Sequence, residues 1–257
     1  MTMDILVERA DEGVMTITFN RPGKKNAITT AMYQTMADAL AEAHDDARVR
    51  AILIRGSADA FSAGNDLEDF TKSPPSGENP PVVQFLRCIS GAQKPIVASV
   101  AGVAVGIGTT LLLHCDLVYA ADSAKFSLPF TQLGLCPEAA STLLLPRLAG
   151  YPLAAEKLLL GEAFDAHEAH RMGIVNRVLP AAELDAFAFG QAVKLAALPA
   201  SALRVTKSLM KRASEEEVAE QMKAEMVHFR KMLSAPEARE AMTAFLQKRK
   251  PDFKQFD

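Results

Sequence analysis

Residues 96–114, IVASVAGVAVGIGTTLLLH, contain the pattern that decides the fold. Residues 96–101 are almost all apolar, as in a strand that is buried on both faces of a parallel sheet. Residues 102–109 then form a glycine-rich loop, and an apolar helical pattern covers residues 106–114. A strand that passes through a short loop into a helix is the unit from which α/β folds are built.

The same alternation of strand and helix continues on both sides of this stretch. Further strand patterns lie at residues 14–19 (VMTITF), 51–55 (AILIR), 117–121 (LVYAA) and 174–179. Further helical patterns lie at residues 152–160 and after the capping residues Thr29 and Thr30, where Met32, Met36, Leu40 and Ala43 share one face. This alternation predicts an α/β core with parallel strand pairing.

Beyond about residue 180 the sequence contains mainly helical patterns. They cover residues 183–197, 201–211, 215–233 and 235–248. Pro199 and Pro236 separate them, because proline does not continue a helix from the preceding turn. We therefore expect two regions, an α/β core of residues 1–195 and a C-terminal helical region of residues 196–257.

The composition excludes several classes of protein. Of the 257 residues, 49% are hydrophobic and 23% are charged, and the formal net charge is -3. These values exclude a disordered chain and argue against a nucleic-acid binder, which carries a basic excess. The 3 cysteines form no C-x-x-C pair, so neither a disulfide framework nor a zinc ribbon fits. Without a secretory signal or an apolar run of about 18 residues, we expect a cytoplasmic protein that binds no membrane.

Two glycine-containing loops follow predicted strands and can carry chemistry. They are residues 61–67 (FSAGNDL) and residues 102–109 (GVAVGIGT). Each loop opens a helix and so directs unpaired backbone N–H groups at the end of a sheet, where two of them can form an oxyanion hole. The second loop is not a dinucleotide fingerprint, because Leu111 stands where that motif needs its third small residue.

Three stretches resemble the crotonase superfamily, also known as the enoyl-CoA hydratase/isomerase superfamily. They are residues 61–67, 101–116 (AGVAVGIGTTLLLHCD) and 130–150 (FTQLGLCPEAASTLLLPRLAG). Asn20-Arg21-Pro22 with Asn26-Ala27, and Glu168-Ala169 with Gly173-Ile174-Val175, extend the resemblance over nearly the whole chain. It implies a crotonase-like spiral of β-β-α units with a C-terminal helical region through which a homotrimer, or a dimer of trimers, assembles.

The resemblance also implies where an acyl-CoA substrate binds. The oxyanion-hole donors fall on the backbone N–H groups of Ala63 and Ile107, and Ile107 stands where many members have glycine. The residues that would contact substrate and CoA are Ser62, Ala63, Gly64, Asn65, Asp66, Leu67, Ala27 and Gly108. Coenzyme A enters as part of the substrate, so neither a metal nor a separate cofactor is implied.

The carboxylates separate the reactions of this superfamily. Hydratases use two glutamates, which would fall on the positions of Thr110 and Phe130. Neither of these side chains can act as a general base near neutral pH. Glu138 lies instead in a segment that resembles the peroxisomal-type Δ3,Δ2-enoyl-CoA isomerases, which move a double bond with one glutamate. As an alternative, Glu138 is a solvated acid at a helix start.

These residues predict a Δ3,Δ2-enoyl-CoA isomerase of fatty-acid β-oxidation with Glu138 as its base. Two alternatives stay open, an enoyl-CoA hydratase and a non-catalytic acyl-CoA-binding protein. The apolar neighbours of Glu138 should raise its pKa and ease proton return. These neighbours are Leu133, Leu135, Leu143 and Leu144.

Overall fold

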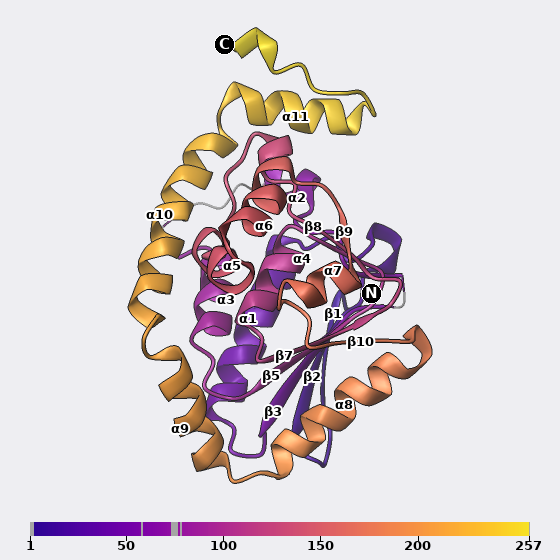
Figure 1. The fold of residues 1–257 in the computed structure, drawn as a ribbon, viewed down its shortest axis with the longest axis vertical. Coiled ribbons are helices and arrows are strands. Elements are labelled where there is room, and N and C mark those ends of the chain that lie inside the picture. Colours follow the sequence, from indigo (N-terminus) through magenta and orange to yellow (C-terminus); the bar gives the residue numbers. More distant parts are fainter. Residues whose placement is uncertain (1–2, 58, 73–76, 78, 257) are drawn as a thin grey trace.

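The computed structural model describes residues 3–256 apart from 58, 73–76 and 78, and its strands form two sheets (Figure 1). The six-stranded sheet consists, in spatial order, of β1 (Ile5–Arg9), β2 (Val14–Phe19), β3 (Ala51–Arg55), β5 (Ile96–Val100), β7 (Leu117–Ala121) and β10 (Arg177–Leu179). The four-stranded sheet consists of β4 (Ala60–Ser62), β6 (Val103–Val105), β8 (Lys125–Ser127) and β9 (Phe164–Asp165).

The parallel core predicted from the sequence is confirmed in the larger sheet. Strands β2, β3, β5, β7 and β10 pair in parallel, and every residue of β5 is buried. This burial on both faces explains why the β5 sequence is apolar without alternation. The strand predicted at residues 174–179 is shorter than expected, since only Arg177–Leu179 pairs with β7. Strand β1, which was not predicted, pairs antiparallel with β2.

Along the chain, strands are added to the two sheets in turn. Strand β4 follows β3, β6 follows β5 and β8 follows β7, each after a short connection. Strands β4, β6 and β8 pair in parallel in that order. The chain therefore winds as a spiral in which each turn adds one strand to each sheet. This arrangement brings the ends of β4 and β6, and the loops that follow them, to the same place.

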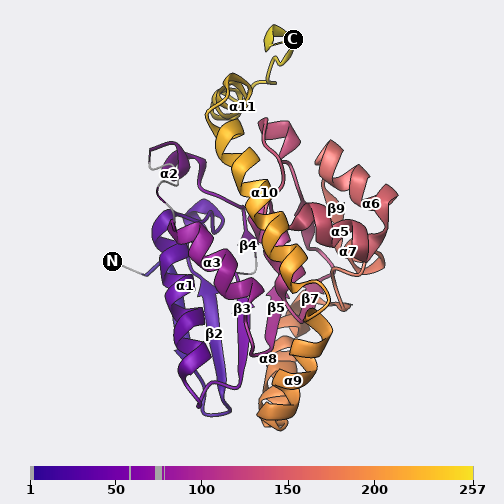
Figure 2. The same ribbon diagram turned by 90° about the vertical axis from the view of Figure 1, so that its left-hand side faces the viewer.

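Helices cover the larger sheet on both sides (Figures 1 and 2). Helices α1 (Thr30–Asp45) and α3 (Pro81–Ser90) pack against each other, and α8 (Ala181–Ala197) packs against β3, β5 and β7. Helix α1 begins as predicted, because the Thr29 side chain accepts a hydrogen bond from the Met32 N–H at 3.3 Å. The shorter helices are α2 (Leu67–Lys72), α4 (Ile107–Thr110), α5 (Ser141–Ala149), α6 (Tyr151–Ala155) and α7 (Ala166–Arg171).

Two predicted helices are irregular. The helix predicted at residues 106–114 is the short α4 followed by a 3-10 turn, Leu111–His114. The helix predicted at residues 152–160 is α6 followed by a π-helical turn, Glu156–Leu160. Both segments are helical as expected, but their hydrogen bonding changes part of the way along.

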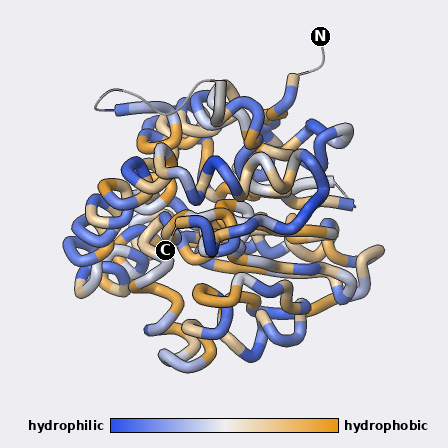
Figure 3. The backbone as a smooth tube through the Cα atoms, turned by 90° about the horizontal axis from the view of Figure 1, so that it is seen from above, coloured by the Kyte–Doolittle hydropathy of each residue, from blue (hydrophilic) through white to orange (hydrophobic). Residues whose placement is uncertain are grey.

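The C-terminal helices are α9 (Ala200–Lys211), α10 (Glu215–Leu233) and α11 (Pro236–Leu246). Helix α10 runs along the molecule between α9 and α11 and packs against α5 (Figure 2). Hydrophobic and hydrophilic residues alternate along the helices on the outside of the molecule (Figure 3). Among the described residues no single helix is long and apolar enough to cross a membrane. Helices α8 and α9 reach that length and composition only as a pair, and the chain bends by 107° between them.

Candidate active site

The two glycine loops predicted to carry chemistry lie against each other. Ala63-Gly64-Asn65 follows β4, and Gly106-Ile107-Gly108 follows β6, the parallel neighbour of β4. A Cβ atom built on Gly64, whose φ is +86°, would lie 2.8 Å from the Val105 carbonyl oxygen. One built on Gly108 would lie 2.8 Å from the Ser62 carbonyl oxygen. Glycine is therefore required on both sides of this contact.

The backbone donors differ from the prediction at one residue. The Ala63 N–H donates to the Lys25 carbonyl oxygen at 2.9 Å, so it has no free hydrogen for a ligand. The assignment of an oxyanion donor to Ala63 is therefore wrong. Among the residues that the structure describes, the N–H groups of Asn65 and Ile107 have no acceptor, and both residues line the cavity described below. In the first loop, therefore, Asn65 and not Ala63 has an N–H group free for a ligand at the cavity.

Asn65 is held from both sides of its backbone and through its side chain. The Ile28 N–H donates to the Gly64 carbonyl at 2.8 Å, and the Asp66 N–H donates to the Ile28 carbonyl at 2.9 Å. The buried Tyr33 hydroxyl donates to Asn65 Oδ1 at 2.5 Å. These bonds fix the direction of the Asn65 N–H.

Removing the Tyr33 hydroxyl should weaken this support. In Tyr33→Phe the ring keeps its packing, but Asn65 Oδ1 loses its donor, which costs about 1 kcal/mol of stability. We expect a kcat lower by roughly 3- to 10-fold, a loss of transition-state stabilisation of similar size. Steady-state kinetics and urea unfolding measure the two effects. An unchanged kcat would mean that Asn65 keeps its position without Tyr33.

Several residues predicted to bind substrate make hydrogen bonds that support the first loop. The Asp66 carboxylate pairs with Arg21 at 2.6 Å and accepts from the N–H groups of Glu68 and Asp69, at the start of α2. Burial alone would raise the pKa of Asp66, but these hydrogen bonds outweigh it and the pKa is lowered. Arg21 also donates to the Ala27 carbonyl at 3.0 Å.

Ser62 is part of the same support. Its hydroxyl donates to the Asn26 carbonyl at 2.9 Å and accepts from the Gly64 N–H at 3.1 Å. Ser62 is buried and does not line the cavity.

A cavity of about 620 Å³ opens in front of both loops. Its walls are mostly apolar and come from the loops, from α10 and from the C-terminal segment. The lining includes Gly64, Asn65, Leu67, Phe70, Ile107, Phe130, Leu135, Phe229, Met242, Phe245, Arg249, Lys250 and Phe253. Arg249 is paired with Glu240 at 2.5 Å, whereas Lys250 forms no ion pair with the residues that the structure describes. The cavity thus has the apolar interior and polar rim of a ligand site.

Glu138 lies in a smaller cavity of about 20 Å³ next to the large one, and Phe70, Phe229 and Leu233 line both. The Glu138 side chain is buried and accepts a hydrogen bond from the Thr110 hydroxyl at 3.1 Å. Burial raises its pKa to about 8, with a further increase from the charge of Glu225, while the Thr110 bond opposes the shift. The predicted rise in pKa is thereby confirmed, and the alternative of a solvated acid is wrong.

Two buried residues that sequence reasoning missed hold the turn after Glu138. The carboxylate of Glu225 accepts from the N–H groups of Ala140 and Thr142, at 2.6 and 3.1 Å. His114 contacts the Ala139 carbonyl oxygen through Nε2 at 2.8 Å. The signal for Glu225 was present, because a charged residue interrupts the apolar α10 face of Met222, Met226 and Phe229.

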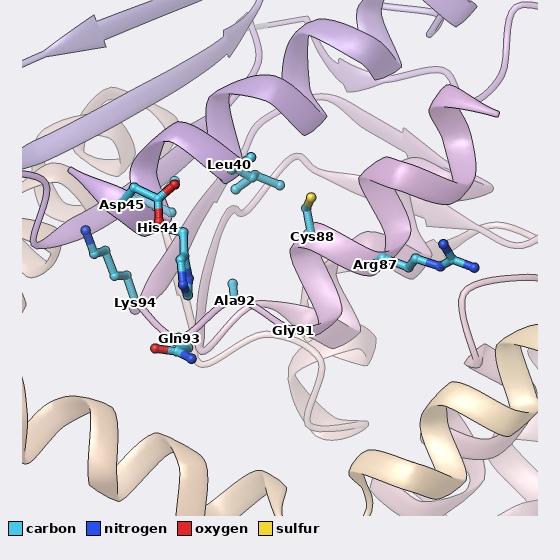
Figure 4. Close-up of a pocket in the computed structure, with 11 residues that line it drawn as sticks. Leu40, His44, Asp45, Arg87, Cys88, Gly91, Ala92, Gln93 and Lys94 are labelled. Atoms are coloured by element: carbon cyan, nitrogen blue, oxygen red, sulfur yellow. The ribbon is translucent and has the colours of Figure 1, made fainter. Parts of the chain in front are cut away.

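A third cavity, of about 250 Å³, lies between α1 and α3 near the start of β5 (Figure 4). None of the predicted site residues lines it. His44 and Lys94 lie on one side and Cys88 on the other (Figure 4). The Lys94 ammonium donates to the Ala43 and Asp46 carbonyls, so it caps the end of α1. Among the described residues no group of three or more histidines, cysteines or acids could hold a metal ion.

The chain belongs to the enoyl-CoA hydratase/isomerase family, whose model matches residues 9–256. It is 37% identical over 222 residues to enoyl-CoA delta isomerase 2 of Homo sapiens, covering 84% of this chain and 56% of the human protein. This chain thus spans about half the length of that relative.

Full-length relatives and solved structures support the same family. The chain is 36% identical over 252 residues to a protein of Mycobacterium bovis named probable enoyl-CoA hydratase, with 97% of each chain covered. A crystal structure of an enoyl-CoA hydratase/isomerase from Pseudoalteromonas atlantica T6c superposes with a TM-score of 0.94 at 41% identity, covering 98% of this chain and 100% of that one. The expected crotonase fold is therefore confirmed.

Proposed function

We propose that this enzyme is a Δ3,Δ2-enoyl-CoA isomerase that uses Glu138 as its single base. The observation that carries the proposal is the position of Glu138, a buried carboxylate of raised pKa beside an apolar cavity. Its hydrogen-bond donor, Thr110, occupies a position where a hydratase of this family would supply an acid. Phe130, at the other such position, supplies an apolar wall.

The proposed reaction moves one double bond without net addition or loss of atoms. Glu138 removes a proton from C2 of a 3-enoyl thioester, and the electrons of that C–H bond form an enolate. The N–H groups of Asn65 and Ile107 would stabilise the enolate oxygen, and each such donor contributes about 2.7–4 kcal/mol. The C3=C4 electrons then take the proton back from Glu138 at C4, which leaves a conjugated C2=C3 bond.

The raised pKa of Glu138 determines the pH dependence of this reaction. The base acts only when ionised, and with a pKa of about 8 roughly one tenth of it is ionised at pH 7. We expect kcat/KM to rise about tenfold per pH unit below this pKa and to level off above it. A rate profile from pH 5.5 to 9.5 measures this rise. An inflection near the ordinary carboxylate value would contradict a buried, protonated Glu138.

Two substrates distinguish the proposal from its alternatives. With a 3-enoyl-CoA, an isomerase increases the absorbance of the conjugated thioester. With a 2-enoyl-CoA, a hydratase removes that absorbance and forms a hydroxyacyl product, as the relative named for hydratase activity would suggest. Saturable binding of both thioesters without turnover would indicate a non-catalytic acyl-CoA-binding protein. The proposal requires the first result.

The exposed apolar surface supports an assembly of several copies. Val205, Leu209 and Met210 on α9, and Leu159 and Leu160 after α6, are exposed large hydrophobic residues. Such clusters commonly mark protein interfaces. We propose a homotrimer or a dimer of trimers, in which CoA binds only as part of the substrate and no metal or other cofactor takes part. Light scattering of the purified protein determines the number of subunits.

A further inference from the structure

The turn that carries Glu138 is anchored to α10 by a second buried carboxylate. Glu225 Oε2 accepts from the Ala140 N–H at 2.6 Å, and Oε1 accepts from the Thr142 N–H at 3.1 Å. The Thr142 hydroxyl also donates to Oε1, and in turn accepts from Gln221 Nε2 at 2.8 Å. Both oxygens of Glu225 therefore bind the segment that begins two residues after Glu138.

This segment needs an external anchor because its backbone is strained. Ala139 and Ala140 have φ values of +60° and +55°, in the left-handed region that disfavours residues with a Cβ atom. Each such residue costs roughly 1–2 kcal/mol and persists only where its surroundings impose it. Glu225 supplies hydrogen bonds on one side of the strained pair, and His114 supplies one to the Ala139 carbonyl on the other.

The carboxylate of Glu225 also faces the base; burial raises the pKa of Glu225, and the hydrogen bonds from Thr142 and Ala140 oppose that shift by favouring its ionised form. Glu138 and Glu225 line the same small cavity, whose other walls are apolar except for Arg230. Among the described residues, other titratable groups around Glu138 are Tyr33 from α1, His114 from the 3-10 turn and Cys136 from the preceding loop. Burial raises the pKa of Tyr33 and that of Cys136, the latter to about 11, and lowers the pKa of His114 to about 4. These three groups stay neutral where Glu138 titrates.

We propose that Glu225 is a positioning residue for Glu138. Glu225 fixes the strained turn by hydrogen bonds, and its negative charge disfavours the ionised form of the base. The proposal rests on the proposed function only in taking Glu138 as the base. This role connects helix α10, in the C-terminal helical region, to proton transfer by Glu138. Met226 and Phe229 on the same helix line the cavities beside Glu138.

Glu225→Gln tests both parts of this role. Glutamine keeps the shape, but it has one acceptor oxygen and no charge. We expect kcat to fall about 10- to 100-fold, as for a catalytic group displaced by a fraction of an ångström to an ångström, with KM within about threefold. The acidic limb of the pH–rate profile should move to lower pH by about one unit, because a like charge no longer disfavours ionised Glu138. A merely structural residue would lower kcat without moving that limb.

Two further variants complete the design. Glu220→Gln removes an exposed carboxylate from the same helix and should leave kcat and the pH profile unchanged. Glu225→Asp keeps the charge but shortens the reach by one methylene, so it should retain the position of the acidic limb with a lower kcat. It also supplies the test if Glu225→Gln does not fold. A wild-type kcat in Glu225→Asp, or an unmoved acidic limb in Glu225→Gln, would overturn the proposal.

A titration that needs no turnover separates this proposal from the isomerase assignment. In protein labelled with ¹³C at glutamate carboxyl carbons, the Glu138 signal, assigned by its loss in Glu138→Gln, should titrate at lower pH in Glu225→Gln than in the wild type. An identical titration in both proteins would refute the coupling. If the shift is seen in a protein without isomerase activity, the coupling stands and the proposed function fails.

Discussion

Glu138→Gln should lower kcat for 3-enoyl-CoA isomerisation by about 10²–10⁴-fold, the usual contribution of a general base. The amide cannot accept the C2 proton, and among the described residues that line the two cavities beside it the other carboxylate is Glu225, whose oxygens are already bonded. Affinity for a saturated acyl-CoA should change little, because Glu138 contributes no charge to the apolar walls of the large cavity. Stopped-flow absorbance and calorimetric titration measure the two quantities.

The matched control for this substitution is Glu162→Gln, at an exposed position outside both cavities. It removes the same functional group and should leave kcat unchanged. Thermal unfolding of both variants shows whether the fold is kept. Glu138→Gln with more than a tenth of the wild-type kcat would exclude Glu138 as the base.

Gly64→Ala should lower kcat by about 10²–10³-fold, the loss that follows removal of one oxyanion-hole donor. The methyl group would lie 2.8 Å from the Val105 carbonyl oxygen, at a φ of +86°. Backbone cannot give way as a flexible side chain does, so the first loop must move away from β6. The neighbouring Asn65 N–H would then change its position relative to the Ile107 N–H.

Gly23→Ala is the control for this change, because nothing lies within 4 Å of a Cβ atom built there and its φ is not in the left-handed region. It should have wild-type kinetics. A spectroscopic probe of enolate stabilisation, such as the shift in carbonyl stretch of a bound thioester, should decrease in Gly64→Ala alone. Equal kcat values in the two variants would show that the two loops need not be in close contact.

Patterns in the sequence predict five of the six strands of the larger sheet, all but β1, and none of the strands of the smaller sheet. Strands β2, β3, β5 and β7 have five or six residues and a burial pattern that hydrophobicity can report. Strands β4, β6, β8 and β9 have two or three residues, too few for any period to emerge. Their pairing depends on the spiral that brings distant segments together, which no local window contains.

The candidate site is likewise predictable from the sequence only in part. The resemblance to the family implies Glu138 and Ile107 from motifs within one loop each, but the choice between Ala63 and Asn65 depends on a partner far along the chain. The Lys25 carbonyl, in a turn whose residues Lys25 and Asn26 have positive φ, takes up the Ala63 N–H. Glu225 and His114 likewise reach the Glu138 turn only through tertiary packing.

Transfer of deuterium within one substrate molecule tests the central claim most directly, namely that a single buried carboxylate carries the proton from C2 to C4. A 3-enoyl-CoA with deuterium at C2 is converted in ordinary water, and the product is analysed by mass spectrometry and NMR at low conversion. Because Glu138 is buried, the deuteron should stay on the carboxyl and appear at C4 in a measurable fraction of the 2-enoyl product. Hydrogen from solvent alone at C4, or a hydroxyl group at C3, would contradict a single-base isomerase.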